Sequence, residues 1–211
     1  MPRQKVDVKE KYAAMSEYEN QAREMGISLI AGMDEAGRGP LAGPVVAAAV
    51  MLDPEKPIYG VDDSKKLSPK KRAALKAEIE EKAISVGIGI VDVETIDTIN
   101  ILEATKLAMK KAVAALDPQP QQLLIDAVQL KDLPIPQKPI IKGDALSVSI
   151  AAASIIAKET RDEMLKAYDE LYPEYGFASH KGYGTKQHMD AIRTYGPLPI
   201  HRKTFIKNIV G

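Results

Sequence analysis

The sequence of 211 residues contains no cysteine. Disulfide bonds, thiolate zinc sites, iron–sulfur clusters and cysteine nucleophiles are therefore excluded, and only carboxylate or imidazole side chains can hold a metal. The chain also has no net charge, because 29 Lys and Arg balance 29 Asp and Glu. A nucleic-acid or cation site must therefore come from the uneven placement of charges along the chain.

Long apolar runs are missing as well. The longest run, residues 45–52, has the length of a strand, whereas a membrane-spanning helix needs about 20 apolar residues. The first 20 residues are too polar for a secretory signal, so we expect a cytoplasmic protein that does not bind membranes. With 45% hydrophobic and 27% charged residues, the chain is typical of a globular protein with a core, and its length predicts one domain with or without an appendage.

The apolar spacing predicts an α/β or α+β architecture around a mixed sheet. Apolar side chains that recur every three or four positions within residues 1–26 indicate one amphipathic helix. Strands are expected at residues 27–33, 45–52, 86–91, 122–126 and 140–142. Helices are expected at residues 68–83, 94–116, 147–171 and 186–195, and the remainder from residue 173 is rich in loops.

Four acidic residues lie at the ends of strand-like runs or just before a helix: Asp34, Glu35, Asp126 and Asp144. Ligand sites of open α/β sheets form at strand ends, and clustered carboxylates repel one another unless a hard cation neutralises them. Mg²⁺ or Mn²⁺ is the natural occupant of such a cluster. Any one acid could instead cap a helix or form a turn, an alternative with about even odds for Asp144 alone. All four together favour a metal site.

Gly37-Arg38-Gly39 follows the first two acids and forms a turn in which backbone N–H groups can approach an anion. Lysines and arginines are dense in residues 65–72, and residues 177–211 carry six of them against one acid. Taken alone, Gly37-Arg38-Gly39 is more commonly a flexible turn with a solvated arginine, and the basic cluster at residues 65–72 is more commonly the solvated face of a helix. Beside a carboxylate-metal site, both basic clusters become candidate contacts to a phosphate backbone. The three histidines are not spaced as a zinc site, and we expect one or two to be structural.

The motifs resemble those of a known family. Bacterial ribonuclease HII, the type 2 ribonuclease H family, has a signature that is similar to residues 32–48, GMDEAGRGPLAGPVVAA. Similar family blocks follow in the same order at residues 63–68, 100–102, 124–126, 142–144, 152–158, 180–185 and 201–205. Type 3 enzymes carry a different motif after the first acids, so the resemblance is to ribonuclease HII. One departure is Ala127-Val128 after Asp126, where many relatives have Gly-Asn.

The resemblance implies a ribonuclease H-like α/β fold with a mixed five-stranded sheet flanked by helices and a helical, loop-rich C-terminal part. Residues 1–26 would be an N-terminal helical extension and residues 27–211 the ribonuclease H type 2 domain. It also implies a monomeric, metal-dependent endonuclease that uses two Mg²⁺ or Mn²⁺ ions. This enzyme would cut the RNA strand of RNA–DNA hybrids and incise 5′ to single ribonucleotides in duplex DNA, leaving 3′-OH and 5′-phosphate ends.

The family motifs also imply roles for individual residues. Asp34, Glu35, Asp126 and Asp144 would be the metal-binding catalytic acids, the same four that the strand ends single out. The residues implied to contact substrate are Gly37, Arg38, Gly39, Ser64, Lys65 and Tyr183, with Tyr183 at the junction between RNA and DNA. Two alternatives stay open. One is a metal-dependent hydrolase or transferase acting on a small phosphorylated substrate, and the other is a catalytically silent nucleic-acid-binding module.

Overall fold

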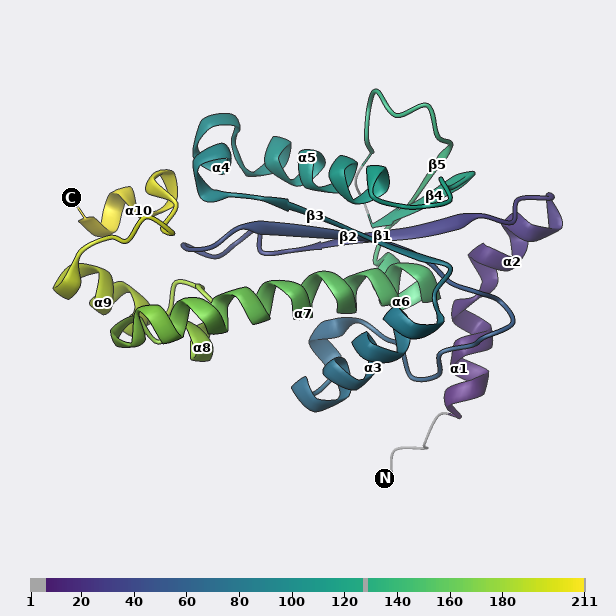
Figure 1. Cartoon of the computed structure of the whole chain (residues 1–211), viewed down its shortest axis with the longest axis horizontal. Helices are drawn as coiled ribbons and strands as arrows, with labels where there is room; N and C mark the ends of the chain where they lie inside the picture. The colour runs from purple at the N-terminus through teal and green to yellow at the C-terminus, as the bar shows by residue number, and fades with distance from the viewer. Residues whose placement is uncertain (1–6, 127–128, 211) are drawn as a thin grey trace.

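The computed structural model describes residues 7–126 and 129–210. Its centre is a five-stranded sheet in the order β3-β2-β1-β4-β5 (Figure 1). The strands are β1 (Ile30–Ala36), β2 (Val45–Met51), β3 (Ser85–Val91), β4 (Gln122–Asp126) and β5 (Gln137–Ile140). β2 is antiparallel to both β1 and β3, whereas β4 is parallel to both β1 and β5. The predicted α/β class with a mixed sheet is therefore confirmed.

Helices cover both faces of the sheet, as the alternation of strands and helices predicts (Figure 1). On one face, α7 (Val148–Leu171) and α3 (Pro69–Lys82) bury a core against β2 that includes Val46, Val50 and Ile155. On the other face, α4 (Val93–Ile99) and α5 (Ile101–Ala114) bury a second core that includes Met33 and Met109. β1 and β2 contribute side chains to both cores, so the strand that carries Asp34 is enclosed from both sides.

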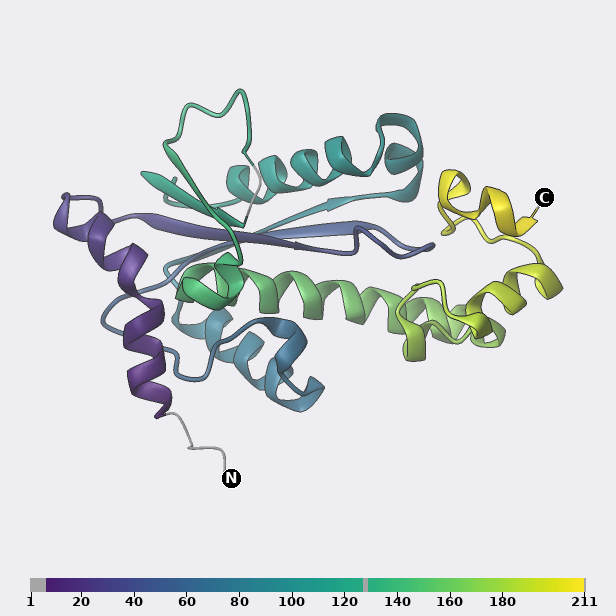
Figure 2. The same cartoon turned by 180° about the vertical axis from the view of Figure 1, so that it is seen from behind.

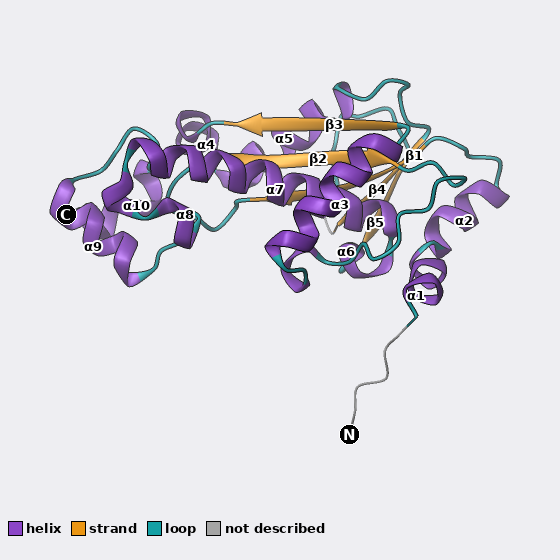
Figure 3. Cartoon of the chain, turned by 60° about the horizontal axis from the view of Figure 1, so that its bottom comes forward, coloured by secondary structure: helices purple, strands orange, loops and turns teal. Residues whose placement is uncertain are grey.

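The first and the last helices lie at opposite ends of the molecule (Figures 2 and 3). At one end are α1 (Val8–Met15) and α2 (Glu17–Glu24). At the other end are α8 (Phe177–His180), α9 (Lys186–Tyr195) and α10 (Lys203–Val210), which share a small core around Tyr175 and Phe177 with the last turns of α7. Among the described residues, no helix combines the length and the apolar character that crossing a membrane requires.

Two helices predicted as continuous are each broken into two. The helix expected in residues 1–26 is divided at Ser16. The Ser16 hydroxyl donates to the carbonyl oxygen of Tyr12, and its backbone N–H donates to the carbonyl oxygen of Ala13. The helix expected at 94–116 is interrupted at Asn100, which has a φ of 69°. The Asn100 side chain then accepts hydrogen bonds from the N–H groups of Leu102 and Glu103 and so caps α5.

Strand boundaries also differ at two places. The strand expected at 27–33 begins only at Ile30, because the N–H groups of Ser28 and Leu29 donate to the side chain of Gln121 instead of a neighbouring strand. The strand expected at 140–142 ends at Ile140 and starts earlier, at Gln137. Lys142 adopts a left-handed conformation, with φ 59°, that no strand accommodates.

Candidate active site

β1 brings Asp34 and Glu35 to the centre of the sheet. The strand, which was expected to end at residue 33, continues through both acids to Ala36. Asp34 is 8% exposed and its Oδ1 accepts the backbone N–H of Glu35 at 2.7 Å. Glu35 lies at 3.5 Å from the guanidinium of Arg38. Both side chains nevertheless line the same cavity.

The other two acids reach the same region from β4 and from the short helix α6 (Gly143–Leu146). β4 is parallel to β1, so the carboxyl ends of the two strands meet at one edge of the sheet. Asp126 is the last residue of β4, and its Oδ1 accepts the N–H of Gly143 at 3.2 Å. This hydrogen bond ties Asp126 to α6, on which Asp144 is 9% exposed.

The electrostatics show that the four acids form one group. Burial first, and then the charges of Glu35 and Asp126, raise the pKa of Asp34 well above its usual range. Burial raises the pKa of Glu35, and Asp126 adds to the rise while Arg38 opposes it. The pKa of Asp144 is raised by burial and by the charges of Asp63 and Asp126. A site in which carboxylates are buried and repel one another favours binding of a cation.

The donor set is made of oxygen atoms, which suits hard cations such as Mg²⁺ and Mn²⁺. Within residues 7–126 and 129–210, no three Asp, Glu or His side chains are gathered so that they alone could hold an ion. Mg²⁺ is usually bound by one or two carboxylates together with waters and substrate phosphates rather than by a complete protein cage. The arrangement of the acids therefore fits an ion that completes its coordination on the substrate.

A cavity of about 360 Å³ opens beside Asp34 and Glu35. It brings together all six residues for which the sequence predicts substrate contact: Gly37, Arg38, Gly39, Ser64, Lys65 and Tyr183. The Tyr183 ring is 47% exposed at this cavity. Asp126 and Asp144 do not line it, but the charge of Asp126 contributes to the raised pKa of both Asp34 and Asp144. Ala127 and Val128, where the chain departs from its relatives, lie outside the described residues.

Two buried arginines hold the loop after β1 in place. Arg202 is fully buried and donates to the carbonyl oxygens of Gly37, Arg38 and Gly43 at 2.5, 2.9 and 3.0 Å. Arg161, 1% exposed, donates to the carbonyl oxygens of Ala42, Pro44 and Lys181. Their guanidinium groups occupy the carbonyl side of the loop. Among the described residues, the backbone N–H groups of Arg38 and Gly39 have no acceptor, and they remain available to an anion.

Gly37 shows why this loop needs glycine. Its φ is 96°, and a Cβ atom built on it would lie 2.2 Å from Nε of Arg161. A side chain here would be strained and would displace the arginine that fixes the loop. The close approach of backbone and guanidinium therefore depends on a residue with no side chain.

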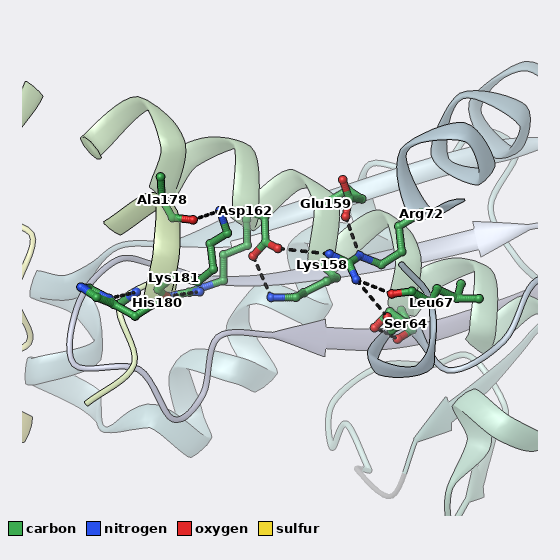
Figure 4. A network of polar contacts seen from close by, with 12 residues as sticks. Ser64, Leu67, Arg72, Lys158, Glu159, Asp162, Ala178, His180 and Lys181 are labelled. Carbon is green, nitrogen blue, oxygen red and sulfur yellow. Dashed lines mark hydrogen bonds and ion pairs between the residues drawn. The ribbon is translucent and has the colours of Figure 1, made fainter. Parts of the chain in front are cut away.

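A second buried arginine network holds the segment that contains Ser64 (Figure 4). Arg72 donates from Nε to Glu159 at 2.6 Å and from Nη1 to the carbonyl oxygens of Ser64 and Leu67. Asp162 lies between Arg72 and Lys158, at 3.7 and 2.8 Å (Figure 4). Ser64 also accepts a hydrogen bond from Ser154, whose hydroxyl contacts Asp34.

The sequence-based interpretation of the basic clusters is wrong for some members. Arg72 and Arg202 are buried at 8% and 0% exposure, and they bind carbonyl oxygens and a carboxylate inside the protein instead of a phosphate backbone. All three histidines are buried, whereas one or two structural histidines were expected. The sequence reasoning also gave no individual role to Ser154, Lys158 or Arg161, which line the cavity. The signal that could have identified these three residues is their spacing along α7, which places them on one face of the helix.

Comparisons with known proteins agree with this geometry. The chain shares its fold with the crystal structure of the ribonuclease H2 from Pyrococcus horikoshii OT3, with a TM-score of 0.72 and 29% sequence identity over 86% of this chain and 96% of that one. The shared fold and the acids at the ends of β1 and β4 place the protein among the ribonuclease H-like nucleases.

A family model described as Ribonuclease HII matches residues 31–208. The chain is 60% identical over 204 residues to the ribonuclease HII of Bacillus cereus (strain B4264), covering 96% of this chain and 79% of that protein. It is 59% identical over 200 residues to the ribonuclease HII of Acetivibrio thermocellus, covering 95% and 78%. The chain therefore belongs to the ribonuclease HII family. It is a hydrolase, an endonuclease that acts on RNA–DNA hybrids.

Proposed function

We propose that this enzyme also incises 5′ to single ribonucleotides embedded in duplex DNA and leaves 3′-OH and 5′-phosphate ends. The observation that carries the proposal is the composition of one cavity, where Asp34 and Glu35 face the loop of Gly37–Gly39, the cation Lys65 and the ring of Tyr183. One nucleotide and its phosphate placed there would meet acids, backbone donors and an aromatic surface together.

The proposed cofactor is Mg²⁺ or Mn²⁺ at a two-ion site held by Asp34, Glu35, Asp126 and Asp144. When bound, two such ions generate a hydroxide nucleophile and stabilise the leaving 3′ oxygen. The chain's own contribution is to gather the carboxylates and to hold them in place. The Asp34 carboxylate accepts the N–H of Glu35, and the Asp126 carboxylate accepts the N–H of Gly143.

Selectivity for a single ribonucleotide requires contacts to its 2′-hydroxyl, because this group alone distinguishes it from the flanking DNA. The free N–H groups of Arg38 and Gly39 can donate to the 2′-hydroxyl oxygen and to the adjacent phosphate. Lys65 and Ser64 lie across the cavity and can bind the backbone phosphate. The exposed ring of Tyr183 supplies a surface on which the nucleotide at the RNA–DNA junction stacks.

A duplex with one embedded ribonucleotide tests the proposal directly. In Mg²⁺ or Mn²⁺ the enzyme should produce one nick on the 5′ side of that ribonucleotide. Asp34→Asn and Asp144→Asn should abolish the nick and retain binding to the uncut duplex, since both variants keep the shape of the acid and lose its charge. Cleavage of a long hybrid without any nick at the single ribonucleotide would contradict the proposal. Unchanged cleavage by both variants would contradict the roles of the acids.

The role of Tyr183 has its own test. Loss of a stacking ring costs about 1–3 kcal/mol, so Tyr183→Ala should lower incision at a single ribonucleotide by about 5- to 150-fold. Cleavage of a long hybrid should fall less, because many positions along it can be cut. Tyr195→Ala is the control, since Tyr195 is an exposed tyrosine on α9 that does not line the cavity. Equal losses on both substrates would show that Tyr183 does not recognise the junction.

We also propose that the N-terminal helices belong to the same folded unit as residues 27–211 and that the enzyme acts as a monomer. Met15 and Ala22 are buried in the cores beneath the sheet. Glu19, 2% exposed, accepts hydrogen bonds from Ser147 and Ser149 at the start of α7. Size-exclusion chromatography with light scattering should give the mass of one chain, 23.0 kDa.

A further inference from the structure

Three histidines form a buried cluster behind Tyr183, outside the residues to which a function has been assigned. His188 is completely buried, and His201 and His180 are 2% and 8% exposed. The rings of His180 and His188 stack with centroids 4.4 Å apart, and Phe177 packs edge-on against both. The cluster connects α8, α9 and the segment before α10, and His201 also pairs with Ala42 in the loop after β1.

The hydrogen bonds allow only one placement of the protons on His201 and His188. The N–H of Leu198 donates to Nδ1 of His201 at 2.8 Å, so this nitrogen carries no proton and Nε2 does. Nε2 of His201 lies 3.0 Å from Nε2 of His188 and must donate to it. His188 therefore carries its proton on Nδ1, which donates to the carbonyl oxygen of Tyr183 at 2.9 Å.

The third histidine, His180, has an equally defined tautomer. The N–H of Gly182 donates to its Nδ1 at 3.1 Å, so Nε2 is protonated and donates to the carbonyl oxygen of Tyr175 at 2.7 Å. Both ring nitrogens of every histidine in the cluster are thus occupied. The backbone on either side of Tyr183 is held by imidazole groups, at the N–H of Gly182 and at the carbonyl of Tyr183 itself.

The chain of hydrogen bonds requires neutral rings, because a doubly protonated imidazole cannot accept. Burial, and then the neighbouring histidines, lower the pKa of His201 to about 4. Burial also lowers the pKa of His188 to about 4. Both rings are therefore neutral near pH 7, and the direction of donation from Leu198 to Tyr183 is fixed.

We infer that His201 and His188 position Tyr183 at the mouth of the cavity and thereby set the preference of the enzyme for a single ribonucleotide over a long hybrid. The inference rests on the role proposed above for Tyr183. The ring of Tyr183 lies next to Gly39, since a Cβ built on Gly39 would be 3.8 Å from Cε1 of Tyr183. A shift of the Tyr183 backbone would change this distance and the width of the cavity at its entrance.

Two substitutions of His188 separate positioning from packing. The amide nitrogen of asparagine occupies the place of Nδ1, so His188→Asn keeps the donor to Tyr183 and loses the contact with His201. The amide group of glutamine reaches the place of Nε2, so His188→Gln keeps an acceptor for His201 and loses the donor to Tyr183. Each variant removes one hydrogen bond and the buried ring, and the two should be destabilised alike.

The measurement is the ratio of kcat/KM for a duplex with one ribonucleotide to kcat/KM for a long hybrid. His188→Gln should lower this ratio by about fivefold, the equivalent of one net hydrogen bond, whereas His188→Asn should preserve it. In a Tyr183→Ala background His188→Gln should cause no further loss, because its effect passes through Tyr183. Equal effects of Gln and Asn, or a full additional loss in the Tyr183→Ala background, would overturn the inference.

The outcomes also distinguish this inference from the proposed function. If Tyr183→Ala lowers the ratio and His188→Gln does not, only the positioning role of the histidines is wrong. If Tyr183→Ala itself leaves the ratio unchanged, the proposed role of Tyr183 is wrong and the inference falls with it. ¹⁵N NMR of the imidazoles near pH 7 provides an independent readout. We expect protons on Nε2 of His180 and His201 and on Nδ1 of His188, and a proton on Nε2 of His188 would contradict the hydrogen-bond chain.

Discussion

The contact between β1 and the start of α7 is the tightest point near the acids, and Gly32→Ala tests it. A Cβ atom at Gly32 would lie 2.1 Å from the carbonyl carbon of Ser149 and 2.2 Å from the backbone nitrogen of Ile150. Ordinary contacts of this kind begin near 3.4 Å, so β1 and α7 would have to separate by more than an ångström. Because both atoms belong to backbone, no side-chain rotation can relieve the clash.

The expected cost follows from this geometry. Overpacking in a rigid core costs about 1–3 kcal/mol, and a backbone-to-backbone clash falls at the upper end or beyond. Separation would also move Asp34 on β1 relative to Asp144, which precedes α7. Gly32→Ala should therefore lower both the free energy of unfolding, measured by urea denaturation, and cleavage of an RNA–DNA hybrid at a temperature where the variant stays folded.

Gly39→Ala is the matched control because it is the same substitution in the neighbouring loop. Its Cβ would meet only Cε1 of Tyr183, at 3.8 Å, so the free energy of unfolding should stay within about 0.5 kcal/mol of wild type. The added methyl group points into the cavity and should act on substrate binding instead. A Gly32→Ala protein with wild-type stability and activity would refute the reasoning, because it would show that β1 and α7 separate at no cost.

Three further predictions follow from buried polar groups. Arg202→Lys keeps a charge but loses the planar guanidinium that binds the carbonyl oxygens of Gly37 and Gly43. This variant should lower the free energy of unfolding by about 2–4 kcal/mol in urea denaturation and should raise KM. Arg193→Lys, on the exposed face of α9, is the control and should change neither quantity. Glu19→Ala leaves three donors of Ser147 and Ser149 without their acceptor and should lower the free energy of unfolding by about 2–4 kcal/mol. Glu19→Gln retains an acceptor oxygen and should lower it less. Equal losses for the two variants would contradict the role of the acceptor. Acidification should destabilise the protein through His188 and His201: their folded pKa of about 4 lies below the unfolded value of 6.5, so the unfolded chain binds more protons between these values and stability is lost as the pH falls through that window. The loss is about 1–2 kcal/mol per histidine between about pH 7.5 and pH 5, because the two rings are hydrogen-bonded and do not take up protons independently, and His188→Asn should show a correspondingly smaller loss.

The sequence identifies the acids because their signal is local. An apolar run that ends in Asp34-Glu35 or in Asp126 can be seen without knowledge of the fold, and parallel pairing of β1 and β4 then brings the two ends together. Helix caps are equally local, which is why Ser68 and Pro69 predict the start of α3. The break at Asn100 escapes prediction because the apolar spacing continues across it, and only the φ of 69° interrupts the helix.

What the sequence does not reveal is which charges are turned inward. Arg72, Arg161 and Arg202 are indistinguishable in sequence from the exposed Lys65 and Lys203, yet each guanidinium is buried on backbone carbonyl oxygens of the loops that line the cavity. A buried arginine is stable only where several acceptors converge on its planar fork, and loops supply such acceptors when their N–H groups face elsewhere.

The same geometry lets a buried arginine shape the cavity through the backbone that it holds. By occupying the carbonyl oxygens of Gly37 and Arg38, Arg202 fixes the orientation of the peptide units whose opposite side faces the cavity. The neutral pair His201 and His188 acts in the same way on the carbonyl oxygen of Tyr183. Buried cations and imidazoles on the carbonyl side thus leave donors and an aromatic ring on the substrate side. This division explains why Arg202, His188 and His201 of the basic C-terminal part support the site through hydrogen bonds inside the protein.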